Sequence, residues 1–538
     1  MAADAAKLLK RLEQLKSQRA IVEDVWRDCY RYTYPLRGVG LEDKSTDGTT
    51  LAATAADLQA SLYDSTGTDS TRIHASALMS GLTPANSRWF QIDVDGVDDA
   101  GRQWLDAAAD AIWENIHQSN YDAAAFDCMV DITVTGQFAL FCDEADQGGY
   151  QFEQWPLATT YFAASEPGGM VDTVLNEFPM TAEQAVRAYG ENMVSEKVLK
   201  ASKDKPDEKF VFVRAIYPRE GKNGRMARNM PVASCHFERE SKKVVRESGY
   251  HEMPIGVPRW SPIPGTAYAF GPVFDALPDL KTLNKVVEFV LKNADLAIAG
   301  MWIAEDDGVL NAKSIKIGPR KVIVANSVDS MKPLQPAGKF DVAALEIDRL
   351  QRSVRKVLMS DQLTPQAEGP AMTATEISVR VELIRQQLGP VYGRMQAEFL
   401  QWLVTRCFGL AYRAGALGMA PRSLQGANFS VKYISPISRA QKAVDVAAMD
   451  RFENALALEA EATGNAGLLD NYNWDEAARL RAELLGVPMK LIPDRDDVQA
   501  AREGRQKQQE QMQMGDMLAN VVRDSAGQLI GLAAGKGA

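Results

Sequence analysis

Apolar positions in the first third of the chain recur every three or four residues, which is the spacing of an amphipathic helix. A first helical pattern runs from Leu8 to Trp26. Further helices are predicted over about 57–82 and about 98–135. The segment 37–56 is rich in Gly, Thr and Asp, and this composition predicts a surface loop.

From about 136 to 270 the pattern changes to short β-type runs separated by Pro and Gly. These runs are FALF (138–141), FVFV (210–213) and VASCHF (232–237). One helix is predicted among them, with Thr181 as its N-cap and Gly190 just after its C-terminus. On a strand Cys235 and His236 would point to opposite faces.

Two helical patterns then bracket an insert of about 40 residues. The first repeats apolar residues from Leu277 to Ala294, and the second from Phe340 to Val357. The insert contains β-like runs at 315–317 and 321–325. We therefore expect a helical hairpin with a β-tip, which projects from the body unless something packs against it.

The longest helical pattern covers 373–415. Thr373 and Glu376 have the spacing of a capping box, and Pro390 predicts a kink near 386–390. The preceding segment, 360–372, is a Pro- and Gly-containing loop.

The C-terminal part differs in composition. Residues 436–485 carry alanine-rich helical patterns, whereas 495–524 is dominated by charge and glutamine. A lone helix of the latter kind is marginal in water, so it would need neighbours. Together the patterns predict an α+β fold that is mainly α.

Composition and charge exclude several classes of protein. The formal charge is −11, which argues against a protein that grips nucleic acid over its whole surface. The five cysteines are odd in number and widely spaced, so neither a disulfide framework nor a cysteine zinc site is expected. The N-terminus is not that of a signal peptide, and the most apolar stretch (294–304) is too short to span a bilayer. We expect a soluble protein, or part of a soluble assembly.

The residues that enzyme chemistry would require are missing. Neither a phosphate-binding GxxxxGK[ST] loop nor a GxSxG nucleophile motif occurs, and the four histidines form no HExxH motif. The acidic clusters at 305–307 and 494–497 are interpreted as loop tips rather than metal sites. The sequence therefore predicts no enzymatic activity, no metal and no cofactor.

A basic stripe is the one charged pattern that suggests a function. Arg349, Arg352 and Lys356 are three and four residues apart, so they share one helix face, with Arg355 beside them. The simpler interpretation is a solvated face with intrahelical pairs such as Glu346 to Arg349. The alternative is a cationic stripe that faces a polyanion or an acidic neighbouring subunit.

Residues 372–417 resemble the portal, or head-to-tail connector, proteins of short-tailed bacteriophages. The motifs that carry the resemblance are TATE (373–376), Arg380, LGPV (388–391) and Gly393-Arg394. Further blocks in family order are 69–92, 171–190, 258–285 and 433–442. The chain departs from the family pattern at Ala267, where an acidic residue is common, and at Ala269-Phe270-Gly271, which stands for Tyr-Gly-x-Gly.

The resemblance implies a ring of twelve copies with a central DNA channel, divided into named regions. These are a wing (1–272), stem helix 1 (273–297), a clip (298–339), stem helix 2 (340–359), a tunnel loop (360–372), a channel helix and wing return (373–435), a crown (436–494) and a C-terminal helical barrel (495–538).

The same resemblance implies sites on these regions. The DNA channel and tunnel loop would use Gln362, Thr364, Gln366, Glu368 and Thr373. The clip would dock partners through Asp306, Asp307, Lys313, Lys316, Arg320 and Lys321. The basic stripe would face either DNA or the next subunit.

The implied partners are further copies of the chain, double-stranded DNA, the terminase large subunit, a tail adaptor, and scaffolding, major capsid and internal core proteins, with no membrane. The implied location is the capsid portal vertex of the virion, and the host cytoplasm during assembly. Two alternatives are a DNA-processing enzyme, against which the missing motifs count, and a structural tail or internal scaffold protein without a DNA path.

Overall fold

The described part of the chain divides into two units. The computed structural model describes residues 4–45, 47–94, 98–219, 224, 226–299, 301–304, 331–334, 340–363, 389, 391–424, 430–433, 436–485, 487, 492, 498–508 and 511. The first unit comprises Met1–Trp89 and Ala111–Gly418, and the second comprises Phe90–Asp110 and Met419–Ala538. The fold is mainly helical with several small sheets.

The helices of the first unit are α1 (Ala5–Arg31), α2 (Pro35–Glu42), α3 (Gly48–Ala60), α4 (Thr66–Leu82), the last residues of α5 (Asp99–Gln118), α6 (Tyr121–Thr135), α7 (Ala182–Tyr189), α8 (Glu196–Asp204), α9 (Pro272–Ala299), α10 (Phe340–Val357), α11 (Ser360–Leu363), a π-helical turn (Gln396–Leu400) and α13 (Gln401–Arg413).

Its strands are β2 (Leu140–Glu144), β3 (Tyr150–Gln154), β4 (Thr160–Ala163), β5 (Thr173–Thr181), β6 (Lys209–Pro218), β7 (Val232–Glu238), β8 (Val244–Tyr250), β9 (Ile255–Gly256), β10 (Ser261–Pro262), β11 (Ala269–Phe270), β12 (Met301–Ala304) and β13 (Met331–Leu334).

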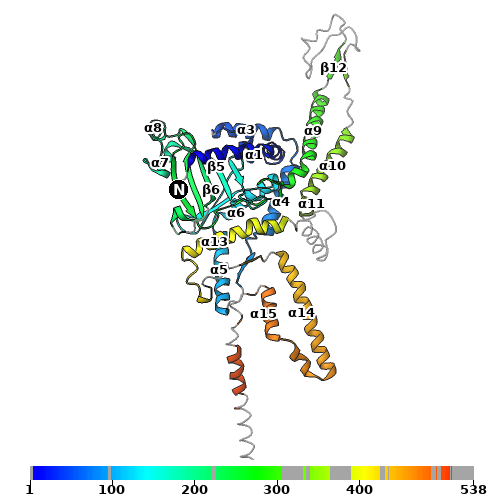
Figure 1. The fold of residues 1–538 in the computed structure, drawn as a ribbon. Helices are drawn as coiled ribbons and strands as arrows, with labels where there is room; N and C mark the ends of the chain where they lie inside the picture. Colours follow the sequence, from blue (N-terminus) through cyan, green and yellow to red (C-terminus); the bar gives the residue numbers. More distant parts are fainter. Residues whose placement is uncertain are drawn as a thin grey trace, which may run out of the picture. The chain divides into compact units, whose positions relative to one another are not determined.

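The largest sheet is antiparallel, with strand order β4-β5-β6-β7-β8, and α1 covers one of its faces (Figure 1). Leu12 and Leu15 of α1 pack against Val213 and Phe237 of the sheet. Arg19 of α1 is 1% exposed and donates hydrogen bonds to the backbone oxygens of two residues in the turn before β4 and of Thr160, the first residue of β4. One helix is thus attached to the sheet by both an apolar stripe and a buried guanidinium.

Helices α7 and α8 cover apolar residues at the other face of this sheet. The predicted boundaries of α7 are confirmed. Thr181 caps it in a capping box with Gln184, and the helix stops at Gly190, whose φ is +87°. Cys235 lies in the cluster under α1, whereas His236 bonds the Tyr189 hydroxyl of α7 (3.0 Å), so the predicted opposite orientation on β7 is also confirmed.

The predicted surface loop over 37–56 is wrong, since α2 and α3 occupy most of it. Pro35 stands at the first position of α2, where its missing N–H loses no hydrogen bond. Asp47 caps α3 by accepting from the backbone N–H of Thr50. Asp47, one of the polar residues that suggested a loop, is therefore a helix cap, and the threonines after it lie within α3.

Two predicted helices are each interrupted. The pattern over 57–82 is divided between the end of α3 and α4, with residues 61–65 between them. The pattern over 98–135 forms α5 and α6, which are separated by Ser119 and Asn120. Asn120 bonds the backbone of Phe152 through both its amide nitrogen and its oxygen, which fixes the break.

The second unit contains a strand pair and a helical hairpin. Strands β1 (Phe90–Asp93) and β14 (Ser430–Tyr433) are antiparallel. Helices α14 (Pro436–Thr463) and α15 (Trp474–Leu485) pack together, and Arg481 of α15 pairs with Glu453 and Asp450 of α14.

All five cysteines are buried free thiols. Within the described residues, none of the helices combines the length and the apolar character that a bilayer-spanning segment requires.

The start of α9 is fixed by a close approach of two glycines. Gly136 ends α6 with φ +85°, and Gly271 immediately precedes α9. A Cβ on Gly271 would lie 2.5 Å from the Thr133 carbonyl oxygen and 2.6 Å from that of Ile132. Only glycine at this position lets α9 begin directly against the C-terminus of α6.

We predict that Gly271→Ala lowers the thermal unfolding midpoint, because overpacking against backbone atoms costs about 1–3 kcal/mol. Gly81→Ala is the matched control. Gly81 lies inside α4 with no heavy atom within 4 Å of its added Cβ, so this substitution should leave the midpoint unchanged or raise it. Differential scanning fluorimetry measures both, and equal midpoints for the two variants would contradict the argument.

Candidate functional site

Helices α9 and α10 form a hairpin that extends from the body of the first unit, with β12 and β13 paired at its far end (Figure 1). Both predicted helices are therefore present, and the strand pair at the tip is formed by residues 301–304 and 331–334. The β-like runs predicted at 315–317 and 321–325 lie outside the described residues. The hydroxyl of Ser353 donates to Asp279 (2.6 Å), which fixes the register between the two helices.

The hairpin is buried at its base and exposed further out. Leu280 and Leu283 of α9, and Leu350 and Val354 of α10, are at most 4% exposed. By contrast Phe289, Leu291 and Leu345 are 53%, 50% and 70% exposed. These large apolar side chains are therefore available for contact with another surface.

The basic stripe lies on the exposed side of α10. Arg349 pairs with Glu346 (Nε–Oε2 3.0 Å), as the simpler interpretation of the sequence predicted, and this hydrogen bond lowers the pKa of Glu346. Arg352 lies 3.8 Å from Asp348, and Lys356 is exposed. Exposed pairs of this kind contribute little to stability, so the cations remain available to another partner.

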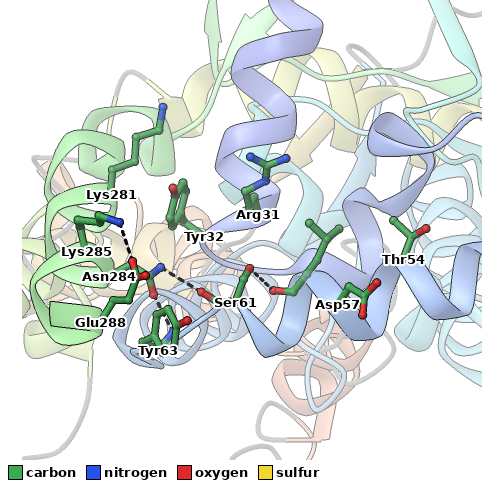
Figure 2. Close-up of a pocket in the computed structure, with 11 residues that line it drawn as sticks. Arg31, Tyr32, Thr54, Asp57, Ser61, Tyr63, Lys281, Asn284, Lys285 and Glu288 are labelled. Atoms are coloured by element: carbon green, nitrogen blue, oxygen red, sulfur yellow. Dashed lines mark hydrogen bonds and ion pairs between the residues drawn. The ribbon is translucent and has the colours of Figure 1, made fainter. Parts of the chain in front are cut away.

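A polar cleft lies beside the base of the hairpin (Figure 2). Its volume is about 490 Å³, and it is formed by the end of α1, by α3 and by α9. Its three cations are all paired: Arg31 with Glu42 (2.6 Å), Lys281 with Asp28 (2.5 Å) and Lys285 with Glu288 (2.8 Å). The cleft therefore has no surplus positive charge with which to bind an anion.

Asn284 explains the position of the cleft. Its side chain accepts from the Tyr63 backbone N–H (2.7 Å) and donates to the Ser61 carbonyl (3.1 Å), as Figure 2 shows. The link between α3 and α4 is thereby attached to α9. We interpret the cleft as a structural joint at the foot of the hairpin.

The end of α10 is held by α4 through contacts that the sequence did not reveal. His74 of α4 is 1% exposed, and its Nδ1 lies 2.9 Å from the carbonyl oxygen of Leu358. Since that oxygen can only accept, Nδ1 carries the proton. Ser360 donates to Ser70, one helical turn before His74 (3.0 Å). Between these contacts Met359 adopts a left-handed conformation with φ +55°.

The helix that returns to the body also departs from regular geometry. Residues 396–400 form a π-helical turn, a feature that is often found at functional sites. Glu398 in this turn accepts hydrogen bonds from the backbone and guanidinium of Arg259, at 2.8 to 3.2 Å. Further along, Arg406 of α13 is 2% exposed and bonds the Cys142 carbonyl, Asp143 and Glu252.

Most of the site residues predicted from the sequence lie outside the described residues. This holds for Thr364, Gln366, Glu368 and Thr373 of the expected tunnel loop, and for the expected kink near 386–390. It also holds for Asp306, Asp307, Lys313, Lys316, Arg320 and Lys321 of the expected clip. Gln362 lies in the short helix α11. Of the predicted sites the structure therefore places the basic stripe alone.

Among the side chains that the structure describes, no group of three or more His, Cys, Asp or Glu is placed to hold a metal ion. Burial, together with Arg214 and Arg246, lowers the pKa of His236 to about 3. Its hydrogen-bond partner is the Tyr189 hydroxyl, and the charged groups near it are cations.

Comparison with known proteins decides the family. The family model described as "Bacteriophage head to tail connecting protein" matches residues 5–492. The chain belongs to this family. The function of this connecting protein is to join the head and tail of a phage, and it is a component of the phage particle.

Two curated relatives support the assignment over nearly full length. The portal protein of Salmonella phage epsilon15 is 27% identical to this connector over 520 residues, which cover 93% of this chain and 91% of the relative. The probable portal protein of Bordetella phage BPP-1 is 26% identical and covers 97% and 94%. Among solved structures, the neck of an empty GTA particle matches 78% of this chain at 13% identity, with a TM-score of 0.36.

We predict that the connector loses stability as the pH falls from about 6.5 to about 4, partly because of His74. Burial lowers the pKa of His74 to about 4. Between these pH values the unfolded chain binds a proton at this histidine that the folded chain does not. This difference lowers the free energy of unfolding by about 3 kcal/mol once the pH has fallen to 4. His74→Asn keeps a donor near Nδ1 but does not titrate. Its midpoint, measured by scanning fluorimetry, should therefore fall less than that of the wild type, and parallel pH profiles would refute the assignment.

Proposed function

We propose that this connector assembles as a ring of twelve copies at one capsid vertex and forms the channel through which the phage genome is packaged and ejected. The match of residues 5–492 to the family carries this proposal. The exposed apolar side chains of the hairpin support it, because neighbouring copies would cover them.

In this proposal the regions of the chain correspond to those of a portal. Residues 1–272 are the wing, α9 and α10 are the stem, and residues 298–339 between them are the clip. Residues 360–372 are the tunnel loop, and 373–435 contain the channel helix and the return to the wing. The crown (436–494) and the helical barrel (495–538) complete the subunit.

The sites follow from the regions. Gln362, Thr364, Gln366, Glu368 and Thr373 would contact the DNA in the channel. Asp306, Asp307, Lys313, Lys316, Arg320 and Lys321 would dock the packaging motor and then the tail adaptor. The residues of both sets are polar or charged, as reversible contacts to DNA or to successive partners require.

The proposed partners are other copies of the chain, double-stranded DNA, the terminase large subunit, the tail adaptor, and scaffolding, major capsid and internal core proteins. The ring would nucleate assembly of the head in the host cytoplasm and remain at the vertex of the virion. The proposed role is mechanical, with ATP hydrolysis supplied by the motor rather than by this chain.

We predict that the purified protein forms closed rings of about 0.7 MDa, twelve times the 59.0 kDa of the chain, without ATPase activity. The double variant Phe289→Ser/Leu345→Ser should reduce the ring fraction severalfold, because it removes apolar area that neighbours would bury. Mass photometry measures the fraction, and negative-stain images show the axial hole.

The matched control for this prediction is Leu36→Ser on α2, a leucine of similar exposure (71%) on the body. Its rings should be intact. Monomers alone at every salt concentration, or ATP hydrolysis that copurifies with the ring, would contradict the proposal.

The basic stripe makes a second prediction. If Arg349, Arg352 and Lys356 face DNA, replacing all three by Gln should leave ring assembly intact and reduce the packaged DNA retained at low salt, by about two- to fivefold. The effect should disappear at high salt, because exposed phosphate contacts are screened.

A triple Gln variant of Lys197, Lys200 and Lys203 on α8 removes the same charge from another exposed helix and should retain DNA normally. If the stripe variant fails to form rings, the stripe is an intersubunit ion-pair seam and does not face DNA.

A further inference from the structure

Two helices that are far apart in sequence are held at one dipeptide, Arg259-Trp260. On one side are Arg394 and Glu398 of the helical segment 391–413. Glu398 accepts from the Arg259 backbone N–H (2.9 Å) and from its Nη2 (2.8 Å), and Arg394 donates to the Trp260 carbonyl. Arg259 and the Glu398 side chain are at most 10% exposed, so this ion pair is shielded from water.

On the other side the dipeptide reaches the end of α10 through His74. The imidazole of His74 lies edge-on to the Trp260 indole, with ring centroids 5.6 Å apart and an interplanar angle of 63°. The Nδ1 atom of the same imidazole donates to the Leu358 carbonyl. A shift of Trp260 therefore changes the orientation of the ring that holds α10.

The dipeptide itself is fixed to the body. The Trp260 N–H donates to the Gly136 carbonyl (2.8 Å), and Arg259 forms an isolated β-bridge with Gln137. Trp260 is 8% exposed. The two helices are thus both attached to a common, buried point.

Both helices are irregular where they meet this point. The left-handed Met359 follows the end of α10 by two residues, and the returning segment contains the π-helical turn around Glu398. Such local departures from regular geometry persist only where surrounding contacts hold them. At each of these irregular positions, one of the contacts that hold it leads, directly or through His74, to the same dipeptide.

We propose that Arg259, Trp260 and His74 form a clasp that couples the end of α10 to the segment 391–413, so that loosening one attachment loosens the other. His74 and Arg259 are positioning residues in this clasp. The consequence for DNA rests on the proposed function, in which these two attachments flank the channel-facing part of the chain.

Hydrogen exchange of the assembled, full-length protein tests the clasp, because it reports both attachments at once. His74→Leu removes the bond to Leu358. It should accelerate exchange about fivefold not only in peptides covering 357–363 but also in those covering 391–400. Glu398→Gln weakens the other attachment, and should accelerate exchange in 357–363 by a similar factor.

The control variants separate coupling from general destabilisation. His74→Asn retains a donor for the Leu358 carbonyl but lacks the ring that contacts Trp260, so in its background Glu398→Gln should no longer accelerate exchange in 357–363. Arg413→Gln, on α13 and away from the clasp, removes a partly exposed ion pair with Glu252. It should leave hydrogen exchange in 357–363 unchanged. If His74→Leu and Glu398→Gln each accelerate exchange only at their own attachment, the clasp does not couple the helices and the proposal is overturned.

Packaged-DNA retention in particles that carry His74→Leu then separates the clasp from its proposed role. If exchange at the two attachments is coupled and DNA retention is altered, both the clasp and its effect on DNA are supported. Coupled exchange with normal retention keeps the clasp and removes its effect on DNA. Independent exchange overturns the clasp, whatever the retention, while intact twelvefold rings would leave the proposed function standing.

Discussion

The close approach of Gly136 and Gly271 is the constraint on which the rest of the first unit depends. It allows α9 to begin against the end of α6, and it leaves the Gly136 carbonyl free to accept from Trp260. The neighbouring Gln137 side chain donates to the Ala267 carbonyl and accepts from the Ala269 N–H. The two neighbouring glycines therefore determine where three parts of the unit lie. These are the base of α9, the strand β11 and the dipeptide that anchors two other helices. A side chain at either glycine would displace all of them together.

Buried arginines also attach helices to the sheets and turns of this unit through hydrogen bonds. Arg19 joins α1 to the turn before β4, Arg406 joins α13 to β2, and Arg259 holds the π-helical turn. A guanidinium is tolerated at such burial only when nearly all its N–H groups find acceptors, since an unpaired buried charge costs several kcal/mol. Apolar contact brings each helix to its sheet. The carbonyl and carboxylate groups that accept from each arginine then fix the position of the helix along its sheet.

The features that could be predicted from the sequence are those whose cause is local. The hairpin helices follow from apolar periodicity, and the boundaries of α7 follow from Thr181 and Gly190. The same local reasoning failed at α2 and α3, because Asp, Thr and Gly are both cap residues and loop residues. The contacts around His74 and Arg259 had no local signal at all. His74 and Leu358 are 284 residues apart, and Arg259 and Glu398 are 139 apart, so only the tertiary fold brings them together. A lone histidine and a lone arginine in the sequence gave no indication of their partners.

Exposed apolar area distinguishes the parts of the fold that the chain's own contacts stabilise from those that contact with another surface would stabilise. The clusters on both faces of the five-stranded sheet are closed by α1, α7 and α8 of the same chain. The hairpin, by contrast, exposes Phe289 and Leu345, and the helical pair of the second unit exposes Leu458 (68%) and Leu485 (56%). A surface that is covered only by further copies gains its stabilisation by mass action, so its order depends on protein concentration, whereas that of the sheet does not. By this measure the sheet owes its order to the chain's own contacts, whereas the exposed apolar side chains of the hairpin contribute nothing to stability until another surface covers them.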